Sequence, residues 1–397
     1  MGVGNDWWPR FSEAEYARRY ARVRAAMDDR GLDALLVYGA SIYFGSDPGG
    51  PNLTYLSGYA PGCHGYVVFP RVGDPTLLVY VPSHGDNARE MSVVADVRAG
   101  NDIAGLAVAR LRELELLGGA IGIVGNFDWS GTSVPLEHFR TFEQQLPNAT
   151  LEIVTTWYED LRLLKSAEEL AFMRTGAAIC DRTHEALREM TRPGVTDNAL
   201  HNEVLRLAHE LGGRIPFSHV GSTSMRNPHL LYPSFYPVNR VVGHGDVVLT
   251  ELAAGYGSYF GKIYGTLAIG DPTPAYRRMF ELAADIYRKI YELVKPGITA
   301  GDTDSFLGGD AGKHGLQSWS YVSGWSTYNT RPAQNRVAPR ADKEMELKPG
   351  HCLNVAGWIV DPDAKMGVWL GDTAVMADDG LRPLHAYRVA DLDYVVV

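Results

Sequence analysis

A carboxylate and an ammonium group occupy matching places on two stretches that are typical of neighbouring β-strands. Glu251 lies near the end of the apolar run "DVVLTEL", and Lys262 follows eleven residues later in "YFGKIYGT". Residues 255–258 supply a turn midway between them, so two antiparallel strands would bring the two side chains face to face. Because a buried charge needs a partner, we expect Glu251 and Lys262 to form a buried ion pair.

Such a pair has several chemical uses. A paired ammonium stabilises a developing oxyanion or binds a substrate carboxylate. A desolvated lysine acts instead as a neutral base or a Schiff-base nucleophile, but the Glu251 carboxylate favours the charged form of Lys262. Histidines such as His229, which follows Pro228 in an irregular segment, are candidate proton carriers, because imidazole titrates near neutral pH.

Composition narrows the class of protein and of partner. The chain has 397 residues and a formal net charge of −10, with acidic and basic residues interspersed. The sequence has no Lys/Arg run, which argues against nucleic acid, and no apolar stretch long enough to span a membrane. The three cysteines, Cys63, Cys180 and Cys352, are far apart, and the first residues lack the apolar core of a signal peptide. These features predict a reduced, cytoplasmic protein.

The pattern of elements predicts two domains. In residues 1–155, helical segments alternate with the buried-strand runs "LDALLVYG", "HGYVVFP" and "PTLLVYVP", as in an α/β domain with a substantially parallel sheet. Residues 156–397 begin with a helix after a capping box formed by Ser166 and Glu169. Strands expected at 247–254, 258–269, 351–361 and 367–377 surround a further helix, so this half is predicted to be α+β.

Several motifs resemble the creatinase/prolidase/aminopeptidase P family, in order and in spacing. They are "NLTYLSGY", "DLRLLKSAEELAFMR", "NPHLLYP…NRVVGHGDVVL", "ELKPGHCLNVAGWIV" and "GVWLGDTAVMADDGLRPL". The resemblance covers nearly the whole chain. It implies an α/β N-terminal domain, an α+β C-terminal domain of the pita-bread fold that holds the site, and a homodimer.

The same resemblance implies that this chain has lost the family's metal centre. Metallopeptidase members bind two metal ions through two Asp, one His and two Glu. The corresponding positions here are Glu251, Lys262, Val322, Ala356 and Gly371. Only one carboxylate remains, and divalent cations need several oxygen or imidazole ligands. We therefore expect no metal and no other cofactor.

Further residues are candidates for binding a small-molecule substrate. Aromatic side chains on or beside the matched strands suggest a hydrophobic or cation-stacking wall. Arg331 is suited to pairing with a substrate carboxylate, and Asp372 follows a lost ligand position. In creatinase, the segment that matches "GCHGY" reaches the partner subunit's site, which makes Cys63 and His64 candidates for a contribution from the partner. The aromatic candidates are Tyr259, Tyr264, Trp325, Tyr328, Trp358 and Trp369.

Creatinase and its close relatives work without a metal and hydrolyse a C–N bond in a small guanidino compound. The family's active-site His corresponds to His229, so the resemblance implies that His229 carries the proton. The carboxylate that holds the guanidinium is replaced by Tyr264, which argues against creatine itself. The resemblance therefore implies a metal-independent hydrolase that cleaves a C–N bond in a small polar substrate bearing a carboxylate. Two alternatives stay open: a metal-free lyase, decarboxylase or isomerase, and a binding protein without catalysis.

Overall fold

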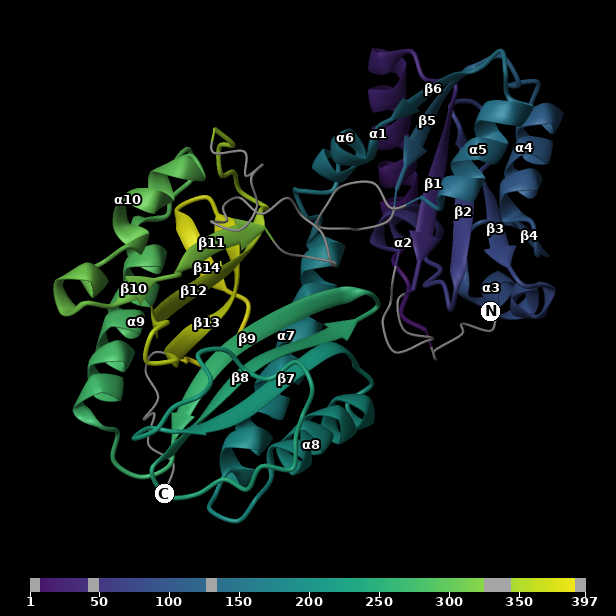
Figure 1. The fold of residues 1–397 in the computed structure, drawn as a ribbon. Helices are drawn as coiled ribbons and strands as arrows, with labels where there is room; N and C mark the ends of the chain where they lie inside the picture. The colour runs from purple at the N-terminus through teal and green to yellow at the C-terminus, as the bar shows by residue number, and fades with distance from the viewer. Residues whose placement is uncertain (1–7, 42–49, 126–133, 325–343, 390–397) are drawn as a thin grey trace. The chain divides into compact units, whose positions relative to one another are not determined.

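The computed structural model describes residues 8–41, 50–125, 134–324 and 344–389 (Figure 1). The chain divides into two compact units, one ending at Arg162 and the other beginning at Leu163. Trp325, Tyr328 and Arg331, three of the predicted substrate-binding residues, lie outside the described residues. Among the described helices, none combines the length and the apolar character that crossing a membrane requires.

The first unit is built on a six-stranded sheet with the order β4-β3-β2-β1-β5-β6 (Figure 1). β1 runs parallel to β5, β5 to β6, and β3 to β4, whereas β2 is antiparallel to both of its neighbours. The predicted parallel character therefore holds for part of the sheet. The strands are β1 (Ala34–Ala40), β2 (His64–Pro70), β3 (Thr76–Tyr80), β4 (Asp96–Gly100), β5 (Ala120–Val124) and β6 (Thr150–Ile153).

Helices cover both faces of this sheet, because successive strand residues point to opposite sides. Leu35 belongs to a core formed with α1 and α2, whereas its neighbour Leu36 belongs to a second core formed with α4 and α5. This arrangement is the predicted α/β domain. The helices are α1 (Glu13–Arg30), α2 (Pro51–Ser57), α3 (Gly85–Met91), α4 (Ile103–Glu113), α5 (Leu136–Gln145) and α6 (Thr155–Asp160).

The second unit contains an eight-stranded antiparallel sheet with the path β10-β12-β13-β9-β8-β7, while β11 pairs with β12 and β14 with β13. The four strands predicted from the sequence correspond to β8, β9, β12 and β13. The other four were not predicted. The strands are β7 (Arg214–Ser224), β8 (Asp246–Tyr256), β9 (Tyr259–Ala268), β10 (Gln317–Ser318), β11 (Tyr321–Gly324), β12 (Cys352–Asp361), β13 (Met366–Ala377) and β14 (Gly380–Pro383).

Three long helices pack against this sheet. α7 (Ala167–Met190) starts at the predicted capping box of Ser166 and Glu169 and lies against β8 and β9. Its approach is close, since a Cβ added at Gly261 of β9 would lie 2.5 Å from the Cα of Ala177. α8 (Asp197–Glu210) lies against β7, and α9 (Pro274–Leu293) against β12 and β13. A short helix, α10 (Asp304–Leu307), follows.

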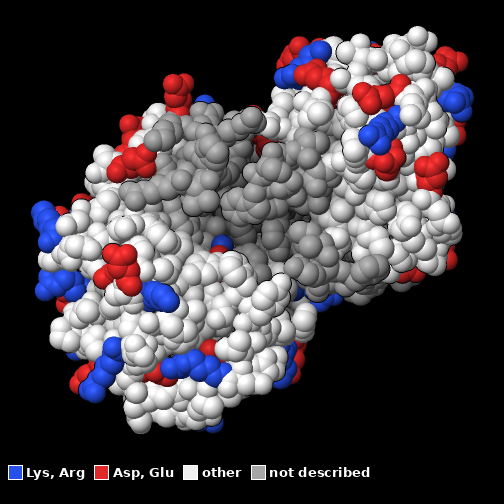
Figure 2. Space-filling view, in the orientation of Figure 1, with Lys and Arg blue, Asp and Glu red and all other residues white. Residues whose placement is uncertain are grey.

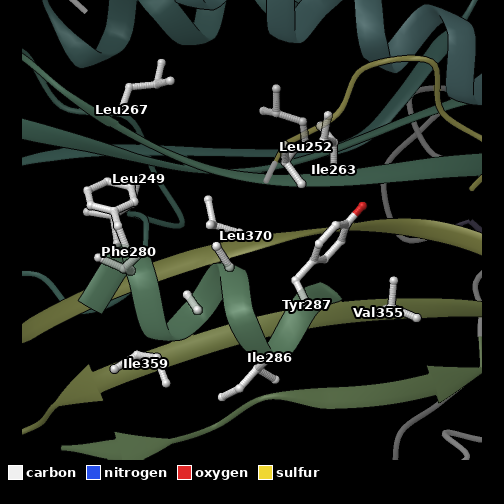
Figure 3. Packing of buried hydrophobic residues seen from close by; sticks show 14 of the residues in the cluster. Leu249, Leu252, Ile263, Leu267, Phe280, Ile286, Tyr287, Val355, Ile359 and Leu370 are labelled. Atoms are coloured by element: carbon white, nitrogen blue, oxygen red, sulfur yellow. The ribbon is translucent and has the colours of Figure 1, made fainter. Parts of the chain in front are cut away.

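The core of the second unit fills the space between the sheet and these helices. Figure 3 shows Phe280 and Tyr287 of α9 near Leu370 of β13, and Ile286 of α9 belongs to the same buried cluster. Successive side chains of a strand alternate between the two faces of a sheet. Strand residues next to core positions such as Leu370 therefore point to the other face. That other face is where Glu251 and Lys262 meet.

Candidate functional site

Glu251 and Lys262 form the ion pair that their spacing predicts. The Lys262 ammonium contacts Oε1 of Glu251, and the two side chains are 10% and 6% exposed, respectively. The register places Tyr264 opposite Glu251 and Ala253 opposite Lys262, so the pair is diagonal rather than directly opposed. A lysine side chain is long enough to cover that offset.

Two further side chains bind the same carboxylate. The Tyr232 hydroxyl donates a hydrogen bond to Oε2 of Glu251. His219 lies opposite Glu251 in the β7–β8 register, with Nδ1 3.5 Å from Oε2 and 3.3 Å from the Tyr232 hydroxyl. We name the four residues Glu251, Lys262, Tyr232 and His219 the carboxylate cluster.

The charges of the cluster follow from burial and pairing. Burial raises the pKa of the Glu251 carboxyl, but Lys262, His219 and Tyr232 together outweigh it and bring the pKa to about 2. Burial lowers the pKa of the Lys262 ammonium, and the Glu251 carboxylate opposes that shift. Burial and the Glu251 charge both raise the pKa of the Tyr232 hydroxyl, which stays a hydrogen-bond donor. Glu251 is thus ionised at neutral pH, held by Lys262 and Tyr232.

Aromatic rings stack beside the cluster. Tyr264 stacks on Trp369 at a centroid distance of 4.3 Å, and Trp369 stacks on Trp358 at 4.2 Å. Tyr321 meets the Tyr264 ring edge-on, with centroids 6.0 Å apart. Lys262 joins the two groups, because its Nζ lies 4.8 Å from the centroid of the Tyr264 ring, within the range of a cation–π contact. We name these four rings the aromatic stack.

His229 does not belong to the carboxylate cluster. It is exposed, and its Nδ1 lies 2.8 Å from the Thr223 hydroxyl. Thr223 is four residues beyond His219 on β7, a separation of about 13 Å along an extended strand. The histidine that contacts Glu251 is therefore His219, which the sequence reasoning missed because β7 was not predicted.

Two predicted substrate-binding residues point away from the cluster. Tyr259 is an odd number of residues from Lys262, so it faces α7, where its hydroxyl donates to Oε1 of Glu169 at 2.7 Å. Asp372 faces α9, where it accepts hydrogen bonds of 2.5 Å from Tyr287 and Tyr291. Tyr259 and Asp372 were predicted to line the site, but strand alternation places both side chains on the opposite face of the sheet. Tyr264 and Trp358, by contrast, belong to the aromatic stack.

Cys63 and His64 belong to the first unit. His64 begins β2, and its ring stacks on that of His138 with centroids 5.5 Å apart. Its Nδ1 lies 3.3 Å from the Tyr38 hydroxyl. Burial, with a smaller effect from His138, lowers the pKa of His64 to about 4, so the imidazole is neutral at pH 7. Cys63 is a half-buried free thiol. Their contribution to a partner's site stays a prediction.

Two family models match the chain. Residues 171–378 match the metallopeptidase family M24, and residues 19–164 match the creatinase/prolidase N-terminal domain. The first match spans more than half of the chain, so this chain belongs to metallopeptidase family M24, a family of hydrolases. The family predicted from the sequence motifs and its two-domain fold class are confirmed.

Relatives match along nearly the full length. The probable dipeptidase PepE of Mycobacterium tuberculosis is 24% identical over 381 residues, covering 94% of each chain. The ectoine hydrolase of Halomonas elongata is 22% identical over 416 residues, covering 94% of this chain and 96% of the relative.

Solved structures show the same fold. The prolidase of Pyrococcus horikoshii OT3 superposes with a TM-score of 0.75 at 20% identity, covering 94% of this chain and 99% of the other. The dipeptidase PepE of Mycobacterium ulcerans superposes with a TM-score of 0.75 at 22% identity, covering 98% of this chain and 100% of the other.

The residues that the sequence resemblance matches to the family's metal ligands do not fit a metal centre. A Cβ added at Gly371 would lie 2.3 Å from the carbonyl oxygen of Val355 and 2.8 Å from Cδ2 of Tyr264, so backbone and ring together leave no room for a side chain at that position. Ala356, opposite Gly371, and the buried Val322 offer no side-chain donor. In the ranges that the structure describes, no three His, Cys, Asp or Glu side chains are grouped to hold an ion. An ammonium beside the one remaining carboxylate repels a cation.

Proposed function

We propose that this M24 hydrolase is metal-independent and cleaves a C–N bond in a small polar substrate that bears a carboxylate. The observation that carries the proposal is the Lys262–Glu251 ion pair, which puts a fixed positive charge at a position where metallopeptidase members have a metal ligand. The ammonium would take over the electrostatic task of the ion, because a buried positive charge stabilises a developing oxyanion.

The carboxylate cluster provides groups for a hydrolytic cycle. His219 is the proposed acid–base residue, because it is the imidazole in contact with Glu251 and 16% of its side chain is exposed. It would accept the proton of the attacking water and return it to the leaving nitrogen. Lys262 would hold the oxygen that gains charge in the transition state, and Glu251 would keep both partners oriented. His229, the residue suggested by the family motif, is the alternative acid–base group.

The aromatic stack supports a small substrate. Tyr264 and Trp369 pack in one buried cluster with Ala356, and the Tyr264 ring lies against Gly371. These rings take up space near Lys262, so the room for a substrate there is small. Most of the named relatives are peptidases, but one is an ectoine hydrolase, a C–N hydrolase, which supports a non-peptide substrate.

The test is a product analysis in the presence of a chelator. Protein treated with EDTA would be incubated with a panel of N-acyl, ureido and amidino carboxylates and with dipeptides. We expect turnover of a non-peptide member, with oxygen from ¹⁸O-labelled water entering the product. Turnover without label would point to a lyase, decarboxylase or isomerase. Turnover of dipeptides that stops in EDTA and returns with Mn²⁺ or Co²⁺ would overturn the proposal.

A further inference from the structure

A concave site lies on the helix side of the sheet, away from the carboxylate cluster. It is a surface pocket of about 390 Å³ between α9 and the β14 segment. Its volume lies within the range of pockets that hold small molecules. The lining residues are Tyr287, Arg288, Tyr291, Leu381, Arg382, Pro383 and Arg388.

The lining carries positive charge and no acidic side chain. Arg288 pairs with Asp285 at 3.3 Å, and their side chains are 56% and 62% exposed. Arg382 pairs with Asp379, and those side chains are also more than half exposed. Exposed pairs of this kind contribute little free energy, so the Arg382 guanidinium can turn toward an incoming anion at small cost. A guanidinium also offers two parallel donors that match a carboxylate or a phosphate.

The rest of the lining is aromatic and apolar. Pro383 on β14 is exposed and Tyr291 on α9 is half-buried, whereas Leu381 is buried beneath them. The hydroxyls of Tyr287 and Tyr291 are both engaged by Asp372, which is itself only 1% exposed. The tyrosines therefore contribute mainly ring surface to the pocket. A ligand that suits the whole lining has an anionic end and an aromatic or aliphatic body.

We propose that this pocket binds a small organic anion whose carboxylate or phosphate contacts Arg382 and Arg388 and whose apolar body packs on Tyr291 and Pro383. The site is separate from the proposed catalytic site, because Asp372 at its base faces the opposite side of β13 from Gly371. Binding at this pocket therefore does not depend on the proposed hydrolase activity.

The test is isothermal titration calorimetry with phenyl phosphate, benzoate and the uncharged benzyl alcohol, at constant ionic strength and up to about 10 mM. We expect one saturable site per chain for at least one of the two anions and none for benzyl alcohol. Phenyl phosphate and benzoate separate a phosphate ligand from a carboxylate ligand. In Arg382→Gln/Arg388→Gln, the affinity should fall by about tenfold or more, because charge-assisted hydrogen bonds are lost.

A control variant makes the result specific. Arg278→Gln removes the same charge from an exposed position on α9 outside the pocket. It should bind the anion with the affinity of the parent. If the double arginine variant is misfolded by circular dichroism, each single variant should still lose affinity. The proposal is overturned if neither aromatic anion shows saturable binding, or if a control variant loses as much affinity as the pocket variants.

Discussion

Glu251 and Lys262 meet diagonally across the β8–β9 hairpin, two residues out of direct register. Diagonal neighbours on one face of a sheet are about 7 Å apart, a gap that the four-carbon stem of lysine bridges. The ammonium then reaches both the Glu251 carboxylate and the face of the Tyr264 ring. One cation is thus held from two sides in a buried place, and its removal leaves a carboxylate that has lost its counter-charge.

Replacing Lys262 by Met should destabilise the fold by roughly 3–5 kcal/mol, the usual cost of leaving one partner of a buried pair alone. The pKa of Glu251 should rise, because Lys262 is the largest of the influences that lower it. Adding Glu251→Gln should recover much of the stability while activity stays lost. Urea unfolding curves measure the free energy of unfolding of the single and of the double variant. Lys289→Met, an exposed change on α9, is the control, and a Lys262→Met variant as stable as the parent would refute the buried pair.

The two candidate histidines should separate in single-turnover experiments. His219→Ala should fold normally and lower turnover by about 10² to 10⁴-fold, the usual contribution of a general acid–base residue. His229→Ala should leave turnover close to that of the parent, because His229 contacts Thr223 rather than the carboxylate cluster. The reverse result would favour the histidine indicated by the family motif. Circular dichroism of both variants excludes misfolding as the cause of a loss.

The strands that carry Glu251 and Lys262, β8 and β9, could be predicted from local sequence, and so could the pairing of the two residues, because a hairpin ties spacing to register. The sequence also determines on which face of the sheet each strand side chain lies, but the predictions for Tyr259 and Asp372 assigned the wrong face. Tyr259 is three residues before Lys262 and Asp372 is one after Gly371, and odd separations along a strand place side chains on opposite faces.

The contact of His219 with Glu251 is a different case. It depends on β7 pairing with β8 across a separation of 32 residues, with an irregular segment between the strands. No local pattern fixes that register, since it is set by how the whole sheet assembles. The Tyr232–Glu251 hydrogen bond was missed for the same reason, because the loop that carries Tyr232 has no periodic pattern.

Metal analysis tests directly whether the residues around Lys262 can hold a metal ion. Protein purified without chelator should contain well under one equivalent of Mn, Zn, Fe or Co, because Lys262 repels cations and Ala356 and Gly371 offer no ligands. EDTA should leave both the melting temperature and turnover unchanged. A stoichiometric ion whose removal abolishes turnover would contradict this prediction.

The family resemblance also predicts a homodimer in which one subunit's N-terminal domain, near His64, contributes to the site of the other. Light scattering at micromolar concentration should give about twice the chain mass of 43.6 kDa. His64→Ala should lower turnover and leave the dimer intact. A monomer with full activity would exclude this arrangement.

Asp372 should make stability depend on pH, because its carboxyl is buried between α9 and β13. Burial raises its pKa to about 6 from an ordinary value of 3.8, against the opposing effects of His385, Tyr287 and Tyr291. A raised pKa means that the fold favours the protonated form. The favourable contribution is therefore complete below about pH 4 and is lost as the pH rises through about 6.

Two pKa units correspond to about 3 kcal/mol of unfolding free energy between these limits. Asp372→Asn should remove this part of the pH dependence, since the amide stays neutral and keeps a hydrogen-bond acceptor for the tyrosine hydroxyls. Urea unfolding at several pH values between 4 and 7.5 would be compared for the parent, for Asp372→Asn and for Asp363→Asn, a change at an exposed position. As the pH rises, the free energy of unfolding of Asp372→Asn should increase relative to that of the parent. The free energy of unfolding of Asp363→Asn should keep a constant difference from that of the parent. A parent and an Asp372→Asn variant with parallel curves would show that Asp372 is already ionised at pH 4 and that the tyrosine hydroxyls outweigh its burial.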